Sequence, residues 1–132
     1  MKLVIGGYAQ GKRAYVMQQI GEKPVVVYDG EVPRRMEEEG TTKKKQQMVL
    51  DHMHLWVKKQ VEECGNPEEE IMTFVDNFPD CIILCDEIGN GIVPADPLER
   101  EYRERTGRIL IGLAKRAEEV ERVICGMGQR IK

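Results

Sequence analysis

Short apolar runs alternate with longer segments of helical periodicity along this chain. The apolar runs predict strands at residues 2–5, 24–28, 48–51, 81–85 and 122–125. The segments between them predict helices at residues 11–20, from just after residue 51 to near Gly65, from Pro67 onward, and at 97–119. Strands that alternate with crossover helices are typical of a parallel sheet. We therefore expect an α/β fold with a doubly wound, mainly parallel sheet and helices on both faces.

Two elements carry patterns that predict their surroundings. Residues 24–28 form a continuous apolar run, PVVVY, of the kind found in buried parallel strands. Glycine inside a helix costs about 1 kcal/mol relative to alanine, so Gly107 and Gly112 predict close packing against the last helix. The last helix is expected to bury an apolar stripe made of Leu98, Tyr102, Ile109, Leu113, Ala117 and Val120.

Composition and charge narrow the class of protein. The 132 residues are 41% hydrophobic with a formal net charge of −3, which suits one domain over residues 1–132 and gives no reason to expect nucleic acid or a membrane as partner. No apolar run resembles a membrane span or a signal peptide, so we expect a cytoplasmic protein. Its four cysteines lack metal-ligand spacing and are expected to be buried, reduced thiols. The highly charged residues 29–46 are expected to form a solvated or mobile excursion.

The first predicted strand runs into a glycine-rich turn that opens a helix: Gly6, Gly7, Tyr8, Ala9, Gln10, Gly11, Lys12 and Arg13. This spacing matches the phosphate-binding P-loop, G-x-x-x-x-G-K-S/T, in which backbone N–H groups and a helix N-terminus converge on an anion. Lys12 would reach the terminal phosphates. Arg13 stands where a hydroxyl normally ligates magnesium, and it either contacts phosphate instead or points outward. The loop predicts a P-loop NTPase-like fold and nucleotide binding; the alternative is a glycine turn that only closes a strand–helix unit.

Polar residues follow the predicted strands, where ligands bind in doubly wound sheets. Besides Lys12 and Asp29, they are Asp51 and the pair Asp86-Glu87. Asp51 is predicted to hold Mg²⁺, as carboxylates beside a P-loop do, or else to cap the following helix. Glu87 is predicted to polarise an acceptor hydroxyl or to hold the same ion, or else to organise its loop.

The histidines of the chain are His52 and His54. Residues two apart do not share a helix face, so a metal pair is disfavoured. A role as a covalent nucleophile is also disfavoured. Both are expected to mark a helix start near the mouth of the site.

Residues 86–94, DEIGNGIVP, resemble the N-E-V-G-x-G-I-V-P motif of the adenosylcobinamide kinase/adenosylcobinamide-phosphate guanylyltransferase family. Residues 98–107 resemble its L-x-R-x-F/Y-R-D-x-x-G segment, and residues 49–56 its V-D-C-L-T-L-W segment. The glycine-rich turn resembles its G-G-x-x-S-G-K loop, and residues 126–132 its G-x-x-x-x-I-K ending. The resemblance covers about three quarters of the chain and implies a part in cobalamin biosynthesis.

The chain also departs from the family pattern. Arg13 replaces the loop serine, Asp86 replaces an asparagine, and Leu110-Ile111 replace an Asn-Gln pair. The segment between the second and third strands is shorter, and no histidine lies between residues 13 and 51, where the family carries the histidine that takes up GMP.

Three functions follow from these observations. The resemblance implies a kinase that uses Mg²⁺ with GTP or ATP to phosphorylate a corrinoid side-chain hydroxyl. Lys12 and Glu87 would serve catalysis, while guanylyl transfer would lack its nucleophile. The alternative is a degenerate paralogue that binds nucleotide, phosphate or a partner without turnover. A weaker alternative is a P-loop kinase for another small hydroxyl substrate. The family also implies self-association as a homo-oligomer.

Overall fold

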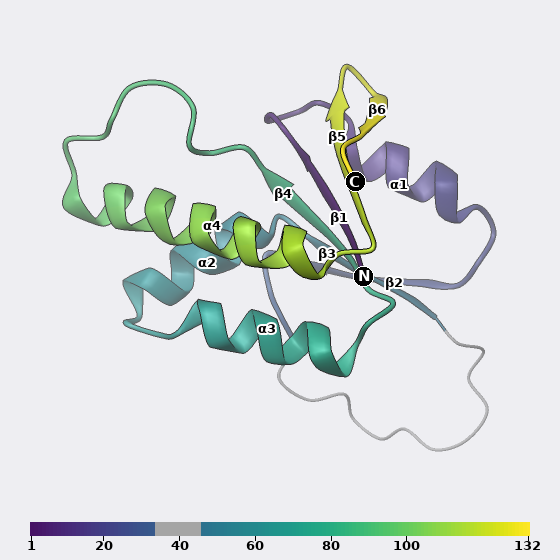
Figure 1. Cartoon of the computed structure of the whole chain (residues 1–132), viewed down its shortest axis with the longest axis horizontal. Coiled ribbons are helices and arrows are strands. Elements are labelled where there is room, and N and C mark those ends of the chain that lie inside the picture. The colour runs from purple at the N-terminus through teal and green to yellow at the C-terminus, as the bar shows by residue number, and fades with distance from the viewer. Residues whose placement is uncertain (34–45) are drawn as a thin grey trace.

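The computed structural model describes residues 1–33 and 46–132, and in this part of the chain a six-stranded sheet is flanked by four helices (Figure 1). The charged stretch predicted at 29–46 lies mostly outside the described residues. The strands are β1 (Lys2–Gly6), β2 (Val25–Asp29), β3 (Gln47–Asp51), β4 (Ile82–Asp86), β5 (Glu119–Ile124) and β6 (Met127–Arg130). Their order is β2-β3-β4-β1-β5-β6, with only the β5–β6 pair antiparallel among these strands. The predicted α/β fold with a mainly parallel sheet is confirmed.

Helices cover both faces of the sheet, as predicted (Figure 1). They are α1 (Lys12–Ile20), α2 (Met53–Glu62), α3 (Pro67–Asn77) and α4 (Pro97–Arg116). Because side chains alternate along a strand, β1 contributes residues to the hydrophobic cores on both faces of the sheet. Its Val4 packs on the α1 side with Val16, whereas Leu3 packs on the other side with Ile109 of α4.

Local sequence sets where the helices begin. The Asn66 side chain accepts a hydrogen bond from the Glu69 N–H at 3.3 Å, and Pro67 occupies the first turn of α3. Asp96 caps α4 in the same way through the Leu98 N–H at 3.0 Å. By contrast, α1 follows Gly11, whose φ of 85° is left-handed and which provides no side-chain cap. The first amides of α1 therefore face the glycine-rich turn.

Three expectations about the elements were wrong in part, and one strand was not expected. β2 is an edge strand and half-buried, because it pairs with β3 alone among the described strands. The last helix ends at Arg116, so Val120 belongs to β5. The last predicted strand, 122–125, is the end of β5, and β6 was not predicted.

The glycine and cysteine expectations also hold only in part. A Cβ on Gly112 would lie 2.6 Å from Met72 Cε, as close packing requires, whereas a Cβ on Gly107 would meet no atom within 4 Å among the described residues. Cys81 and Cys85 are buried; the cysteines at positions 64 and 125 are exposed.

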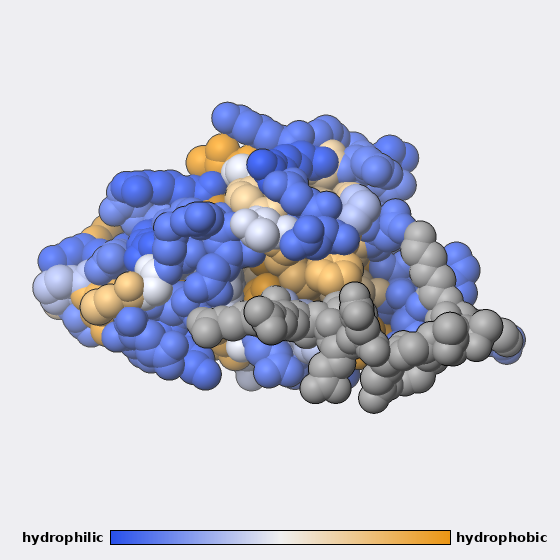
Figure 2. Space-filling model, turned by 90° about the horizontal axis from the view of Figure 1, so that it is seen from below, coloured by the Kyte–Doolittle hydropathy of each residue, from blue (hydrophilic) through white to orange (hydrophobic). Residues whose placement is uncertain are grey.

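The surface is largely hydrophilic in the view of Figure 2, with an apolar area near its centre. In the described ranges, none of the helices combines the length and the hydropathy that crossing a membrane requires.

Candidate functional site

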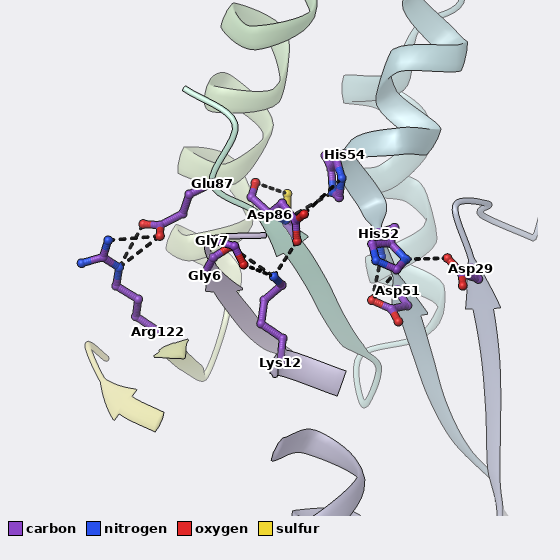
Figure 3. A network of polar contacts seen from close by, with 11 residues as sticks. Gly6, Gly7, Lys12, Asp29, Asp51, His52, His54, Asp86, Glu87 and Arg122 are labelled. Atoms are coloured by element: carbon purple, nitrogen blue, oxygen red, sulfur yellow. Dashed lines mark hydrogen bonds and ion pairs between the residues drawn. The ribbon is translucent and has the colours of Figure 1, made fainter. Parts of the chain in front are cut away.

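The register of the sheet brings acidic residues to one edge. In the pairing of β1 with β4, Gly6 lies beside Asp86, and in the pairing of β2 with β3, Asp29 lies beside Asp51. The carboxyl ends of these four parallel strands therefore meet where the glycine-rich turn begins. Figure 3 shows the side chains that gather there.

Lys12 lies buried beneath the turn, with only 6% of its surface exposed. Its ammonium group donates to the carbonyl oxygens of Gly7 at 2.8 Å and Gly6 at 3.2 Å. The same nitrogen lies 2.5 Å from Asp86 Oδ1 (Figure 3). A charge-assisted contact of this kind is short and directional, so it fixes the lysine at the base of the turn.

The turn itself is held against the β5–β6 hairpin. Gln10 accepts hydrogen bonds from the N–H groups of Cys125 (2.8 Å, side-chain oxygen) and Gly126 (2.9 Å, backbone oxygen). A Cβ on Gly6 would lie 2.5 Å from the carbonyl oxygen of Val123, so only glycine allows this close approach. Tyr8, at the tip, is exposed. The turn is therefore anchored on one side and open to solvent at its tip.

Arg13 faces the carboxylates at the ends of β2 and β3. Its guanidinium nitrogen lies 3.6 Å from Asp51 Oδ2 and 3.7 Å from Asp29 Oδ2. Asp51 Oδ1 accepts from the backbone N–H of His52 at 2.9 Å, just before α2. Oδ2 of the same residue is buried and has no hydrogen-bond partner among the described residues. A positive charge thus stands where the P-loop motif normally supplies a hydroxyl.

Both histidines contact carboxylates of this site. His52 Nδ1 lies 2.6 Å from Asp29 Oδ1. His54 Nδ1 accepts the backbone N–H of Asp86 at 3.2 Å, which leaves its Nε2 at 3.6 Å from the Asp86 carboxylate (Figure 3). Burial lowers the pKa of His54, although the charge of Asp86 opposes that effect. His54 is therefore a neutral imidazole near pH 7.

Glu87 points toward β5. Its carboxylate forms an ion pair with the Arg122 guanidinium, with Oε1 at 3.0 Å from Nε, while its backbone N–H donates to the Gly6 carbonyl. The acidic side chain that contacts Lys12 is Asp86. Asp86 is the last residue of β4 and Glu87 the first residue after it, so the end of the strand separates the two roles.

This edge of the sheet brings together the glycine-rich turn, the buried Lys12 and a second group of charges around Asp51. Backbone amides and Lys12 suit a phosphate chain, and carboxylate oxygens suit a hard cation. A separate cavity of about 340 Å³ lies against α3, lined by Val32, Pro33, Glu69, Glu70, Thr73, Phe74, Asn77 and Phe78, and it includes none of the predicted site residues.

Comparison with known proteins identifies relatives of the chain. Residues 25–131 match the family described as "CobU: Cobinamide kinase / cobinamide phosphate guanyltransferase". A "Bifunctional adenosylcobalamin biosynthesis protein CobU" from Salmonella typhimurium is 41% identical over 51 residues, which cover 39% of this chain and 28% of that protein. The protein of the same name from Escherichia coli is 34% identical over 79 residues, covering 58% and 44%.

These matches cover only part of the relatives and only part of this chain. The aligned segments span less than half the length of either relative. The glycine-rich turn lies before residue 25, outside the family match. The match nevertheless covers most of the described sheet and α2–α4, and the chain therefore belongs to the CobU family of cobinamide kinase / cobinamide phosphate guanyltransferase proteins.

Proposed function

We propose that this chain binds GTP or ATP and transfers the terminal phosphoryl group to a side-chain hydroxyl of a cobinamide-type corrinoid. The observation that carries the proposal is the burial of Lys12 beneath the turn, held by two loop carbonyls and Asp86. A lysine at this place serves no apolar packing role and is costly to bury. Family membership supports the choice of acceptor.

The loop and Lys12 would bind the phosphates. Backbone N–H groups of Gly7 to Lys12 and the N-terminus of α1 would hold the β- and γ-phosphates. Lys12 would exchange its contacts with the loop carbonyls for contacts with phosphate oxygens, while Asp86 holds the lysine ammonium group in place. Phosphoryl transfer depends mainly on positioning and charge neutralisation, which these groups supply.

Mg²⁺ accompanies the nucleotide in this proposal, and the residues fit it. The unpartnered Oδ2 of Asp51 is a buried carboxylate oxygen of the kind that Mg²⁺ prefers. Asp51 would hold the ion, which neutralises charge on the phosphates when bound. Arg13 would add a second positive charge beside the phosphate chain, in place of the missing hydroxyl.

Glu87 would act on the acceptor side. Its ion pair with Arg122 fixes the carboxylate at the mouth of the turn, where it would orient the incoming hydroxyl. The proposal is confined to phosphoryl transfer, because the chain has no histidine between residues 13 and 51 to accept GMP. The proposed partners are a nucleotide and a corrinoid; self-association, a single domain and a cytoplasmic location stay predictions.

A second candidate function is nucleotide binding without turnover. Arg13 favours it, since its guanidinium competes with a metal ion for Asp51. The two functions differ only in whether phosphate reaches an acceptor.

The test is transfer of labelled γ-phosphate from GTP or ATP, with Mg²⁺, to adenosylcobinamide. The kinase proposal expects labelled product from the wild-type chain, its loss in Lys12→Ala, and its retention in Lys23→Ala, which removes an exposed lysine. Nucleotide binding without product would favour the second candidate. Absence of nucleotide binding would contradict both.

A further inference from the structure

Three side chains at the ends of β2 and β3 form a cluster of metal-ligating type. Asp29, Asp51 and His52 each offer one ligand atom, and these atoms lie within 4.8 Å of one another (Figure 3). The register that pairs Asp29 with Asp51 brings the carboxylates together. The left-handed backbone of His52, with φ of 49°, turns the chain so that its ring reaches Asp29.

A second observation points to a cation at this cluster. Only 3% of the Asp51 surface is exposed, and its Oδ2 lacks a hydrogen-bond partner among the described residues. One guanidinium nitrogen of Arg13 lies between the two carboxylates, 3.6 Å from Asp51 Oδ2 and 3.7 Å from Asp29 Oδ2. Those distances exceed a hydrogen bond, so the buried charge is only partly compensated.

The nature of the ligands selects the ion. Mg²⁺ takes oxygen ligands and keeps several waters, whereas an imidazole beside carboxylates favours transition ions such as Mn²⁺, Co²⁺ or Zn²⁺. His52 is the nitrogen donor of the cluster, and its side chain is 38% exposed, which gives an ion a route of entry.

We propose that Asp29, Asp51 and His52 bind one divalent transition-metal ion, which displaces the Arg13 guanidinium. The ion forms one bond to each side chain: one carboxylate oxygen from each aspartate, and Nδ1 of His52 as the neutral imidazole that carries its proton on Nε2. Arg13 is half exposed and is free to swing outward. The inference goes beyond phosphoryl transfer, because the ion binds without nucleotide.

The test is a titration of the nucleotide-free chain with Co²⁺, followed by visible absorption of the bound ion. We expect one Co²⁺ per chain, bound more tightly than Mg²⁺. The variant His52→Asn keeps a residue that tolerates the left-handed backbone. It should weaken Co²⁺ binding at least about tenfold while leaving Mg²⁺ binding nearly unchanged. Arg13→Gln should tighten Co²⁺ binding several-fold, because it removes a competing charge.

The exposed thiols provide the control. Cys64→Ser/Cys125→Ser removes the two exposed thiols and should leave Co²⁺ binding intact. The proposal is overturned if Co²⁺ does not bind, if binding disappears in the cysteine variant, or if His52→Asn weakens Co²⁺ and Mg²⁺ equally or not at all. If His52→Asn does not fold, Arg13→Gln decides: unchanged or weaker Co²⁺ binding overturns it.

Discussion

The Lys12 ammonium lies 2.5 Å from Asp86 Oδ1, so the lysine that would bind phosphate already has a carboxylate partner. Both side chains are buried, and the pair joins the start of α1 to the end of β4. A phosphate chain must share Lys12 with Asp86. The strength of nucleotide binding should therefore depend on the charge at position 86.

Replacing Asp86 by Asn tests that dependence. The amide oxygen still accepts a hydrogen bond from Lys12 but no longer neutralises its charge, so we expect nucleotide affinity to rise several-fold. The free energy of unfolding should fall by about 1–3 kcal/mol, because a buried charged contact is weakened. Fluorescent-nucleotide titration and urea denaturation measure the two effects. Lower affinity in a folded variant would contradict this role.

His54 should make stability depend on pH. Burial lowers its pKa below the ordinary value of 6.5, so the unfolded chain takes up a proton there that the folded chain does not. That contribution to stability is present above about pH 6.5 and is lost as the pH falls below it. Urea denaturation at pH 7.5 and 5.5 should show a steeper loss for the wild type than for His54→Gln. Equal losses in the two proteins would count against a buried neutral imidazole.

The close approach at Gly6 should be sensitive to one methyl group. A Cβ there would lie 2.5 Å from the backbone oxygen of Val123, which cannot rotate away. Gly6→Ala should therefore destabilise the fold by about 1–3 kcal/mol and weaken nucleotide binding. Gly107→Ala is the matched control, since its Cβ meets no described atom within 4 Å and alanine favours the helix. Thermal denaturation compares them; equal effects would disprove the steric argument.

Restoring the hydroxyl in Arg13→Ser should change how metal affects nucleotide binding. Serine supplies the magnesium ligand of the P-loop motif and removes the guanidinium from Asp51. We expect nucleotide affinity to gain more from Mg²⁺ in this variant than in the wild type. Calorimetry with Mg²⁺ and with EDTA gives the comparison, and Asp51→Asn in the same background should abolish the gain. A gain that survives Asp51→Asn would contradict the proposed ligand.

The sheet could be predicted because its central strands are short apolar runs separated by helical segments. The expectation for β2 was wrong for a physical reason. Its apolar run, PVVVY, is typical of an interior strand, but the burial of a strand depends on its place in the sheet order, which the local sequence does not determine. β6 was missed because residues 127–130, MGQR, carry no apolar alternation and pair with β5 through backbone bonds.

Part of the candidate site could also be predicted, because its residues follow strand ends that meet at one edge. What the sequence did not reveal is which side chains face each other. Asp86 contacts Lys12 while Glu87 pairs with Arg122, and that division depends on the direction that each side chain takes at the end of β4. The sequence allows Arg13 two roles, and its position beside Asp51 depends on the long-range pairing of β2 with β3.

The central claim is that the glycine-rich turn binds the phosphates of a nucleotide. A titration of the ¹⁵N-labelled chain with Mg·GTP and Mg·ATP, followed by amide chemical shifts, tests it most directly. The account predicts saturable shifts of the Gly7–Lys12 amides with at least one of them, and their loss in Lys12→Ala. Amides of Gly7–Lys12 that stay unchanged at millimolar concentrations of both nucleotides would contradict it.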